Sequence, residues 1–334
     1  TANITNDLSN RNLVINGAMQ VAQRATSVTG ITSGNYYVCD RWILGYGTAG
    51  TWTLSQSTDT PNDFGNSFKF DCTTANGSLS AGSNLQLKQF FEGQNLQQIQ
   101  KGTSTAKEVT VSFYVKTNKT GTYVVELMDH DNSNRHCNKS YTVSDTNWNR
   151  YTLTFPADTT GTLDNDNAKS FEVGFWLAAG STFTSGSLQT SWGAVTQASR
   201  VSSSQVNIAD NTANEWYITG LQMEVATTAS DFEFLPFDVN LKRCQRYYEI
   251  AEGGFFGPVY GTASDMRTSV PFKVTKRANP TLTKITGEEN CCSSVTVTGN
   301  SLDQTLGARV QGTNVFAAGA SKFFNVKFSA DSEL

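Results

Sequence analysis

The sequence predicts an all-β protein, an antiparallel β-sandwich followed by a smaller C-terminal β domain. Short stretches of alternating apolar and polar residues recur along the chain, as they do in half-buried strands. Charged residues make up only 16 % of the 334 residues, and there are 27 Gly against 6 Pro. This composition is typical of many short strands joined by polar turns, and not of a helical bundle.

The strand signal is strongest in the middle of the chain. Residues 108–117 place Val109, Val111, Phe113 and Val115 on one face, which is the alternation of a strand. Because strands follow one another without helices between them, an antiparallel sandwich is favoured. The other strands are predicted at residues 51–56, 67–72, 122–128, 148–155, 171–178 and 218–225, with two more around a glycine turn at 12–23. Residues 36–44 are a further apolar stretch, and residues 85–99 stay open between a bent strand and a helical turn.

A helical joint is predicted between the two β-rich regions. Leu241, Cys244, Tyr247 and Tyr248 recur at helical spacing. The domains expected are therefore a short N-terminal attachment arm at 1–11, the sandwich at 12–238, the joint at 239–249 and a C-terminal β domain at 250–334. Short strands are expected in the last domain at residues 266–274, 281–285, 293–298, 308–311 and 323–328.

Composition excludes several classes of partner. The net charge is −4 and no basic patch stands out, so nucleic acid is not expected. No apolar run approaches about 20 residues, so membrane insertion is not expected. The N-terminus carries no secretion signal, which predicts synthesis in a cytoplasm. The six cysteines show no regular spacing and are expected to be free thiols.

Candidate catalytic and metal-binding residues are few. The histidines, His130 and His136, lie in the polar stretch 129–139, which is interpreted as a surface loop. Zinc binding there with Cys137 would lack a known ligand spacing, and no phosphate-binding Gly loop is present. An enzyme is therefore not predicted, and no cofactor. Asp164 and Asp166 alternate as in Ca²⁺ loops, so they are candidate ligands for a structural Ca²⁺, with a solvated turn as the alternative.

Aromatic side chains are the more informative candidates for binding. Sugars stack their C–H faces on Trp and Tyr rings, while polar side chains bind the hydroxyls. Trp192, Trp52 and Trp148 are the candidate glycan-binding residues, and Trp176 is expected in the core. Trp192 lies in a long polar stretch at 180–204, of the kind that carries contacts on a rigid sandwich; packing beneath a loop is the alternative.

A subunit interface is predicted around the joint. Tyr247 and Tyr248 are adjacent, so on one helical turn they cannot both face the same core. One of them is expected to pack at the joint and the other in an interface. Arg243 and Arg246 flank them and could pair with carboxylates of a neighbouring chain.

Several short motifs, in order, resemble a module of tailed-phage fibre and receptor-binding proteins. Its opening is similar to NLVINGAMQVAQR at residues 12–24, and Asp40-Arg41-Trp42 matches its next landmark. The resemblance runs to Leu334. The remaining motifs are QFFEG at 89–93, residues 109–116, LAAGS at 177–181, ITGLQMEV at 218–225, CQRYY at 244–248 and the ending ADSEL at 330–334.

The resemblance implies a structural virion protein of a tailed bacteriophage, a tail fibre or receptor-binding component that contacts host surface glycans. Its first part would be a jelly roll of the carbohydrate-binding type. Such proteins commonly form homotrimers and assemble with other phage tail or capsid proteins. The alternatives are a capsid-surface fibre or decoration protein and, less favoured, a tail glycan depolymerase. Its expected location is the virion, after synthesis in the host cytoplasm.

Overall fold

The computed structural model describes residues 10–259, 265–289, 294–299, 307–313 and 319–334. The chain divides into two units, Thr1–Pro236 and Phe237–Leu334, whereas the sandwich was predicted to end at residue 238. Most of the predicted arm at 1–11 lies outside the described residues, and so do Cys291 and Cys292. Cys39, Cys72, Cys137 and Cys244 are buried free thiols, as predicted. In the described ranges, no helix has the length and hydropathy needed to cross a membrane.

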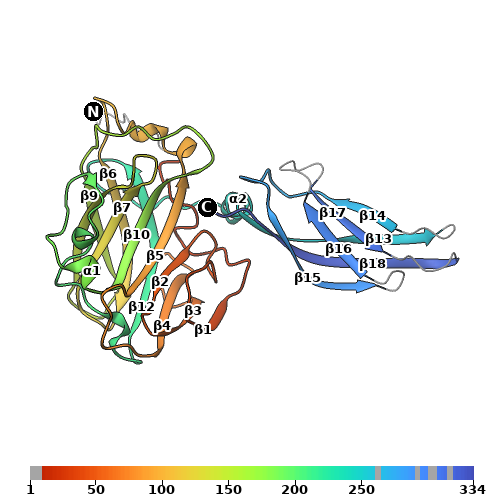
Figure 1. Cartoon of the computed structure of the whole chain (residues 1–334), viewed down its shortest axis with the longest axis horizontal. Helices are drawn as coiled ribbons and strands as arrows, with labels where there is room; N and C mark the ends of the chain where they lie inside the picture. The colour runs from red at the N-terminus through yellow and green to blue at the C-terminus, as the bar shows by residue number, and fades with distance from the viewer. Residues whose placement is uncertain (1–9, 260–264, 290–293, 300–306, 314–318) are drawn as a thin grey trace. The chain divides into compact units, whose positions relative to one another are not determined.

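Two antiparallel sheets form the first unit, which confirms the predicted fold class (Figure 1). The first has the order β1-β3-β4-β12-β6-β9, and the second the order β11-β8-β7-β10-β5-β2. Their strands are β1 Ser27–Ile31, β2 Ile43–Gly47, β3 Thr51–Ser57, β4 Ser67–Thr74, β5 Asn84–Glu92, β6 Val109–Thr117, β7 Gly121–Asp129, β8 Arg135–Val143, β9 Asn149–Phe155, β10 Lys169–Ala179, β11 Gly193–Ala194 and β12 Glu215–Val225.

The strand order is that of a jelly roll. Along the chain, β4, β6, β9 and β12 enter the first sheet, while β5, β7, β8 and β10 enter the second. If these eight strands are numbered 1 to 8 in chain order, the spatial order is 1-8-3-6 in the first sheet and 2-7-4-5 in the second sheet. This double Greek key brings strands from both halves of the sequence together in each sheet. β2 then extends the edge of the second sheet beyond β5, and Figure 1 shows β7, β10, β5 and β2 side by side.

Alternating side chains of both sheets fill the core between them. Val111, Phe113 and Val115 of β6 are completely buried, as the alternation predicts. The Phe113 ring meets Phe175 of β10 edge-on at 5.0 Å between centroids, across the sandwich. Burial of large side chains such as these is the main favourable contribution to folding.

The prediction of two strands at residues 12–23 is wrong. The segment is a buried loop in which Asn16 and Met19 have left-handed backbone with φ of 60° and 55°. The Asn12 side chain donates to the carbonyl of Leu221 at 3.2 Å, and that of Asn16 to the carbonyl of Val21 at 2.8 Å. Asn side chains satisfy buried backbone groups in this way, so apolar alternation here reflects burial without strand pairing.

The interpretation of residues 129–139 as a surface loop is also wrong for most of the segment. Arg135–Val143 forms β8, which pairs with β7 along its whole length. His136 is completely buried in this strand. Residues 85–99, left open above, divide into β5 and two short 3₁₀ turns, Gly93–Asn95 and Gln97–Ile99.

The second unit begins with a helix and continues with paired strands. Its helix α2, Phe237–Gln245, starts two residues before the start of the joint predicted at 239–249 and ends four residues before the end of that joint. One sheet has the order β13-β18-β15 and another the order β14-β17-β16. These strands are β13 Tyr248–Val259, β14 Asp265–Val270, β15 Thr281–Glu289, β16 Ser294–Gly299, β17 Ala308–Thr313 and β18 Gly319–Asp331.

Candidate functional site

The outer face of the second sheet of the sandwich is partly covered. Residues 181–206, called the covering segment below, follow β10, fold back over this outer face and contain α1, Ser181–Thr184. Val201 packs with Val124 of β7 and Trp176 of β10 in a small buried cluster, which Phe183 and Leu188 complete. Trp176 is therefore buried, as predicted, but beneath this covering segment and not between the sheets. The polar stretch that was predicted to carry ligand contacts thus buries part of its surface against the second sheet.

The carboxylate of Glu126 joins the covering segment to the sheet, together with backbone bonds such as that from the N–H of Val206 to the carbonyl of Thr122 at 3.0 Å. Glu126 of β7, which is completely buried, accepts hydrogen bonds from Arg200 Nε at 2.9 Å and Nη2 at 2.6 Å. It also binds the indole N–H of Trp176 at 3.1 Å and lies 3.0 Å from Nδ1 of His136. Burial would raise the pKa of Glu126, but the bonds from His136 and Arg200 outweigh it and lower the pKa.

A second buried carboxylate lies on the same face. Glu172 of β10 is 2 % exposed; its Oε1 lies 3.0 Å from Lys88 Nζ, and its Oε2 lies 3.0 Å from His130 Nε2. Burial would raise the pKa of Glu172, but the charge of Lys88 and the bond from His130 outweigh it and lower the pKa to about 2. His130 is thereby part of a hydrogen-bond network around Glu172.

Stability should consequently fall in acid through Glu172. Its pKa is lower in the folded protein than its ordinary value of 4.5, so its contribution is fully present above about pH 4.5 and is lost as the pH falls toward 2. We expect Glu172 to contribute on the order of 2–3 kcal/mol to this loss. Urea unfolding between pH 6 and pH 2.5 should show a steeper decline for the wild type than for Glu172→Gln; equal slopes would contradict this role.

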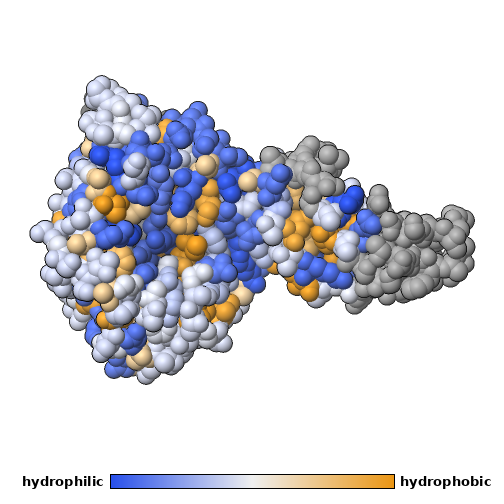
Figure 2. Space-filling view, viewed as in Figure 1, coloured by the Kyte–Doolittle hydropathy of each residue, from blue (hydrophilic) through white to orange (hydrophobic). Residues whose placement is uncertain are grey.

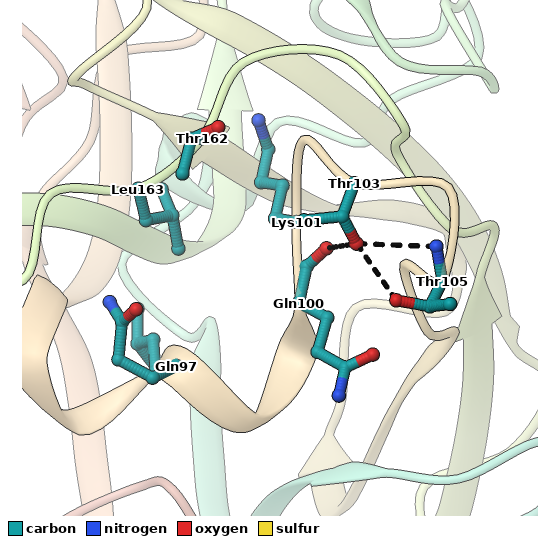
Figure 3. Close-up of a pocket in the computed structure, with 8 residues that line it drawn as sticks. Gln97, Gln100, Lys101, Thr103, Thr105, Thr162 and Leu163 are labelled. Atoms are coloured by element: carbon teal, nitrogen blue, oxygen red, sulfur yellow. Dashed lines mark hydrogen bonds between the residues drawn. The ribbon is translucent and has the colours of Figure 1, made fainter.

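A pocket of about 190 Å³ lies at one end of the sandwich. Leu96 and Leu163 are almost fully buried and supply its apolar wall, while amides and hydroxyls supply the rest. Thr103 Oγ1 donates to the carbonyl of Gln100 at 2.7 Å and accepts from the N–H of Thr105 at 3.2 Å, which fixes the loop. Figure 3 shows where the other labelled lining residues lie. Lys101 is on this loop, Gln97 is on the 3₁₀ turn before it, and Thr162 and Leu163 are on a separate segment.

Lys101 lines the pocket with its side chain, but its ammonium is already bound elsewhere. Its Nζ forms an ion pair with Asp129 and another with Asp158 at 3.1 Å. It also donates to the carbonyls of Thr160 at 3.1 Å and Gly161 at 2.8 Å. The side chain of Lys101 therefore joins the end of β7 to the loop that follows β9.

The tryptophans predicted to bind glycan lie in three separate places. Trp52 is completely buried in the core, so its proposed role is wrong: no sugar can stack on it. Trp192 is half-buried; its indole N–H donates to the carbonyl of Pro156 at 2.8 Å, and its ring centroid lies 5.4 Å from Lys101 Nζ. Trp148 is half-buried and donates to Asp59 at 2.9 Å. The structure does not bring these three residues into one site.

The predicted interface residues are largely buried within the chain. Tyr247 and Tyr248 are 1 % and 8 % exposed, because α2 ends at Gln245 and the chain turns directly into β13. An interface role for the two tyrosines is thus contradicted, since almost none of their surface remains for another subunit. Arg243 and Arg246 are half-buried, and an interface through these two arginines stays a prediction.

The predicted Ca²⁺ ligands form local turn contacts. The N–H of Asp164 donates to Asp131 at 2.9 Å, and Asp166 accepts from the N–H of Ala168 at 2.9 Å. Where the structure describes the chain, no three His, Cys, Asp or Glu side chains form a group that could hold a metal ion. A Ca²⁺ site at Asp164 and Asp166 stays a prediction.

Among the solved structures that are similar to this chain are carbohydrate-binding modules. No protein-family model and no curated protein matches. A family 4 carbohydrate-binding module is 12 % identical, with 63 % of this chain and 98 % of that chain covered and a TM-score of 0.33. A putative sugar-binding protein from Bacteroides thetaiotaomicron is 11 % identical, with coverage of 64 % and 100 % and a TM-score of 0.36. The N-terminal cellulose-binding domain of Cellulomonas fimi β-1,4-glucanase C is 13 % identical, with coverage of 62 % and 99 % and a TM-score of 0.33.

The pocket residues and the Glu126 network were both missed in the sequence. Glu126 could have been noticed, because it is a lone charge inside the apolar strand 122–128, and a buried charge needs partners. Its partner Arg200 lies 74 residues away, so no local pattern indicates it. The pocket residues Gln97, Gln100, Thr103 and Thr105 belong to a polar run that shows no motif.

Proposed function

We propose that the protein is a non-enzymatic structural component of a tailed-bacteriophage virion that binds host surface glycans. The ordered motifs from residue 12 to Leu334 support the phage assignment. A homotrimer attached to other tail or capsid proteins, and a location on the tail or particle surface, belong to the same proposal. The assignment to a virion rests on the resemblance of the sequence to phage fibre proteins. The proposed glycan binding rests on the pocket.

The observation that carries glycan binding is the composition and size of the pocket. Drug-sized ligands occupy pockets of roughly 300–1,000 Å³, so a volume of about 190 Å³ suits a single small unit, such as one sugar residue. Leu96 and Leu163, at 1 % and 5 % exposed, contribute only a small apolar surface to the C–H groups of a sugar. The Gln97 amide nitrogen already donates to the carbonyls of Gly93 at 3.0 Å and Asp164 at 3.4 Å. The groups that can bind sugar hydroxyls are therefore the Gln97 side-chain oxygen, the Gln100 amide and the Thr162 hydroxyl, which together offer donors and acceptors.

The test is binding to polysaccharide purified from the surface of candidate host bacteria. Retention on immobilised polysaccharide, without release of oligosaccharides during incubation, is the expected result. Release of oligosaccharides would overturn the non-enzymatic assignment and favour the depolymerase. Labelling the protein in assembled particles would separate tail from capsid, and light scattering that shows a stable monomer would contradict the trimer.

Two adjacent glutamines provide a matched test of the pocket. Gln97 lines it, whereas its exposed neighbour Gln98 does not. We expect Gln97→Ala to weaken glycan binding about three- to tenfold, the effect of one lost hydrogen bond, and Gln98→Ala to leave it unchanged. Equal effects of the two substitutions, measured by calorimetry with the polysaccharide that binds, would place the site elsewhere.

A further inference from the structure

We infer that the pocket takes an uncharged sugar residue and discriminates against sialic and uronic acids; this rests on the proposed glycan binding. Sugar acids carry a carboxylate, which proteins bind most strongly with Arg or Lys side chains. The question is therefore whether the pocket offers a cation that is not already bound.

The described residues that line the pocket offer no unbound cation. Among the eight described residues that line the pocket, Lys101 alone is ionisable, and it is only 3 % exposed. Its ammonium is held by Asp129, Asp158 and two backbone carbonyls. In Figure 3 the ammonium lies toward Thr162 and away from the side chain of Gln100. A carboxylate in the pocket would have to displace buried carboxylates to reach it.

The positive and negative charges of the ion-pair group around Lys101 also balance. Arg135 Nη2 and Nε lie 3.0 and 3.1 Å from the two oxygens of Asp158, so two cations, Lys101 and Arg135, face two carboxylates, Asp129 and Asp158. The buried group as a whole therefore projects no net positive charge toward a ligand.

Beyond this balanced group, carboxylates lie beside the pocket at Asp164 and Asp131, while the exposed Lys107 lies two residues beyond the lining residue Thr105. The carbonyl of Asp164 lies 3.4 Å from Gln97 Nε2, and the Asp164 side chain belongs to an exposed residue. Burial raises the pKa of Asp131; hydrogen bonds from the N–H of Asp164 and from Ser170 act against this, and the negative charges of Asp164 and Asp129 add to it. An anionic sugar would add a further negative charge to this group, whereas a neutral hexose would not.

The direct test compares monosaccharides by saturation-transfer and chemical-shift NMR at about 0.15 M salt. The probes are the methyl glycosides of glucose, galactose, mannose and N-acetylglucosamine, against those of glucuronic, galacturonic and N-acetylneuraminic acid. We expect at least one neutral sugar to bind, with shifts in the residues around Gln97, and the acids to bind less well than their neutral counterparts.

A charge-adding pair of variants sharpens the test. Gln100→Lys places an ammonium at the pocket, while Gln98→Lys adds the same charge on the exposed turn outside the lining. We expect Gln100→Lys alone to improve uronic-acid binding, roughly fivefold, as one exposed charge contact would. Wild-type protein that binds acids as well as neutral sugars, with loss in Gln97→Ala, would overturn the neutral-sugar inference and leave glycan binding standing. Failure of every sugar to bind would overturn both.

Discussion

Replacing Lys101 with methionine is expected to lower the free energy of unfolding by about 3–5 kcal/mol. The substitution keeps most of the side-chain volume but removes the charge between Asp129 and Asp158, which are completely and almost completely buried. Asp158 keeps Arg135, and Asp129 keeps the N–H groups of Asp131 and Asn132. Even so, one buried negative charge is left without a cation, and that residual charge causes the loss.

A surface ion pair provides the control. Lys119 pairs with Asp210, and both side chains are about one third exposed, so Lys119→Met should cost at most about 1 kcal/mol. Urea unfolding of both variants measures the difference. If the buried charge is the cause, adding Asp129→Asn to Lys101→Met should restore part of the stability. A loss below about 1 kcal/mol for Lys101→Met would show that water reaches these carboxylates.

The fold could be predicted from the sequence because its main determinant is local. The alternation of Val109, Val111, Phe113 and Val115 depends only on neighbours in the chain, and it reads correctly as β6. β8 was missed for an equally local reason: its sequence, RHCNKSYTV, carries polar residues on the face that the covering segment buries. Sequence alone cannot distinguish a polar side chain in water from one that is buried with partners.

The pocket could not be predicted from the sequence. Of the three candidate tryptophans, Trp192 has its ring centroid 5.4 Å from Nζ of the lining residue Lys101, but it does not line the pocket itself, and its glycan-binding role stays a prediction. The pocket itself joins residues 96–105 to residues 162 and 163, segments that meet only because β5, β10 and β7 are neighbours in the sheet. A contact of this kind depends on topology, and no spacing along the chain encodes it.

Replacing Glu126 with glutamine should have a comparably large but more local effect. Glutamine preserves the shape, but it removes the charge that holds the guanidinium of Arg200 and replaces an acceptor oxygen with an NH₂ donor. The bidentate pair is almost fully buried, with the two side chains 11 % and 0 % exposed, so a loss of about 3–5 kcal/mol is expected. Because Arg200 lies on the covering segment, that segment should loosen first.

Hydrogen exchange and limited proteolysis can separate this local loosening from global unfolding. In Glu126→Gln, residues 181–206 should exchange faster and become cleavable, while core strands such as β6 and β12 keep their protection under native conditions. Glu215→Gln is the matched control, because Glu215 pairs with Lys69 and is 38 % exposed; it should change stability by less than about 1 kcal/mol. Uniform acceleration across the whole sandwich would mean that the covering segment and the two sheets unfold as one unit, with Glu126 stabilising all of it.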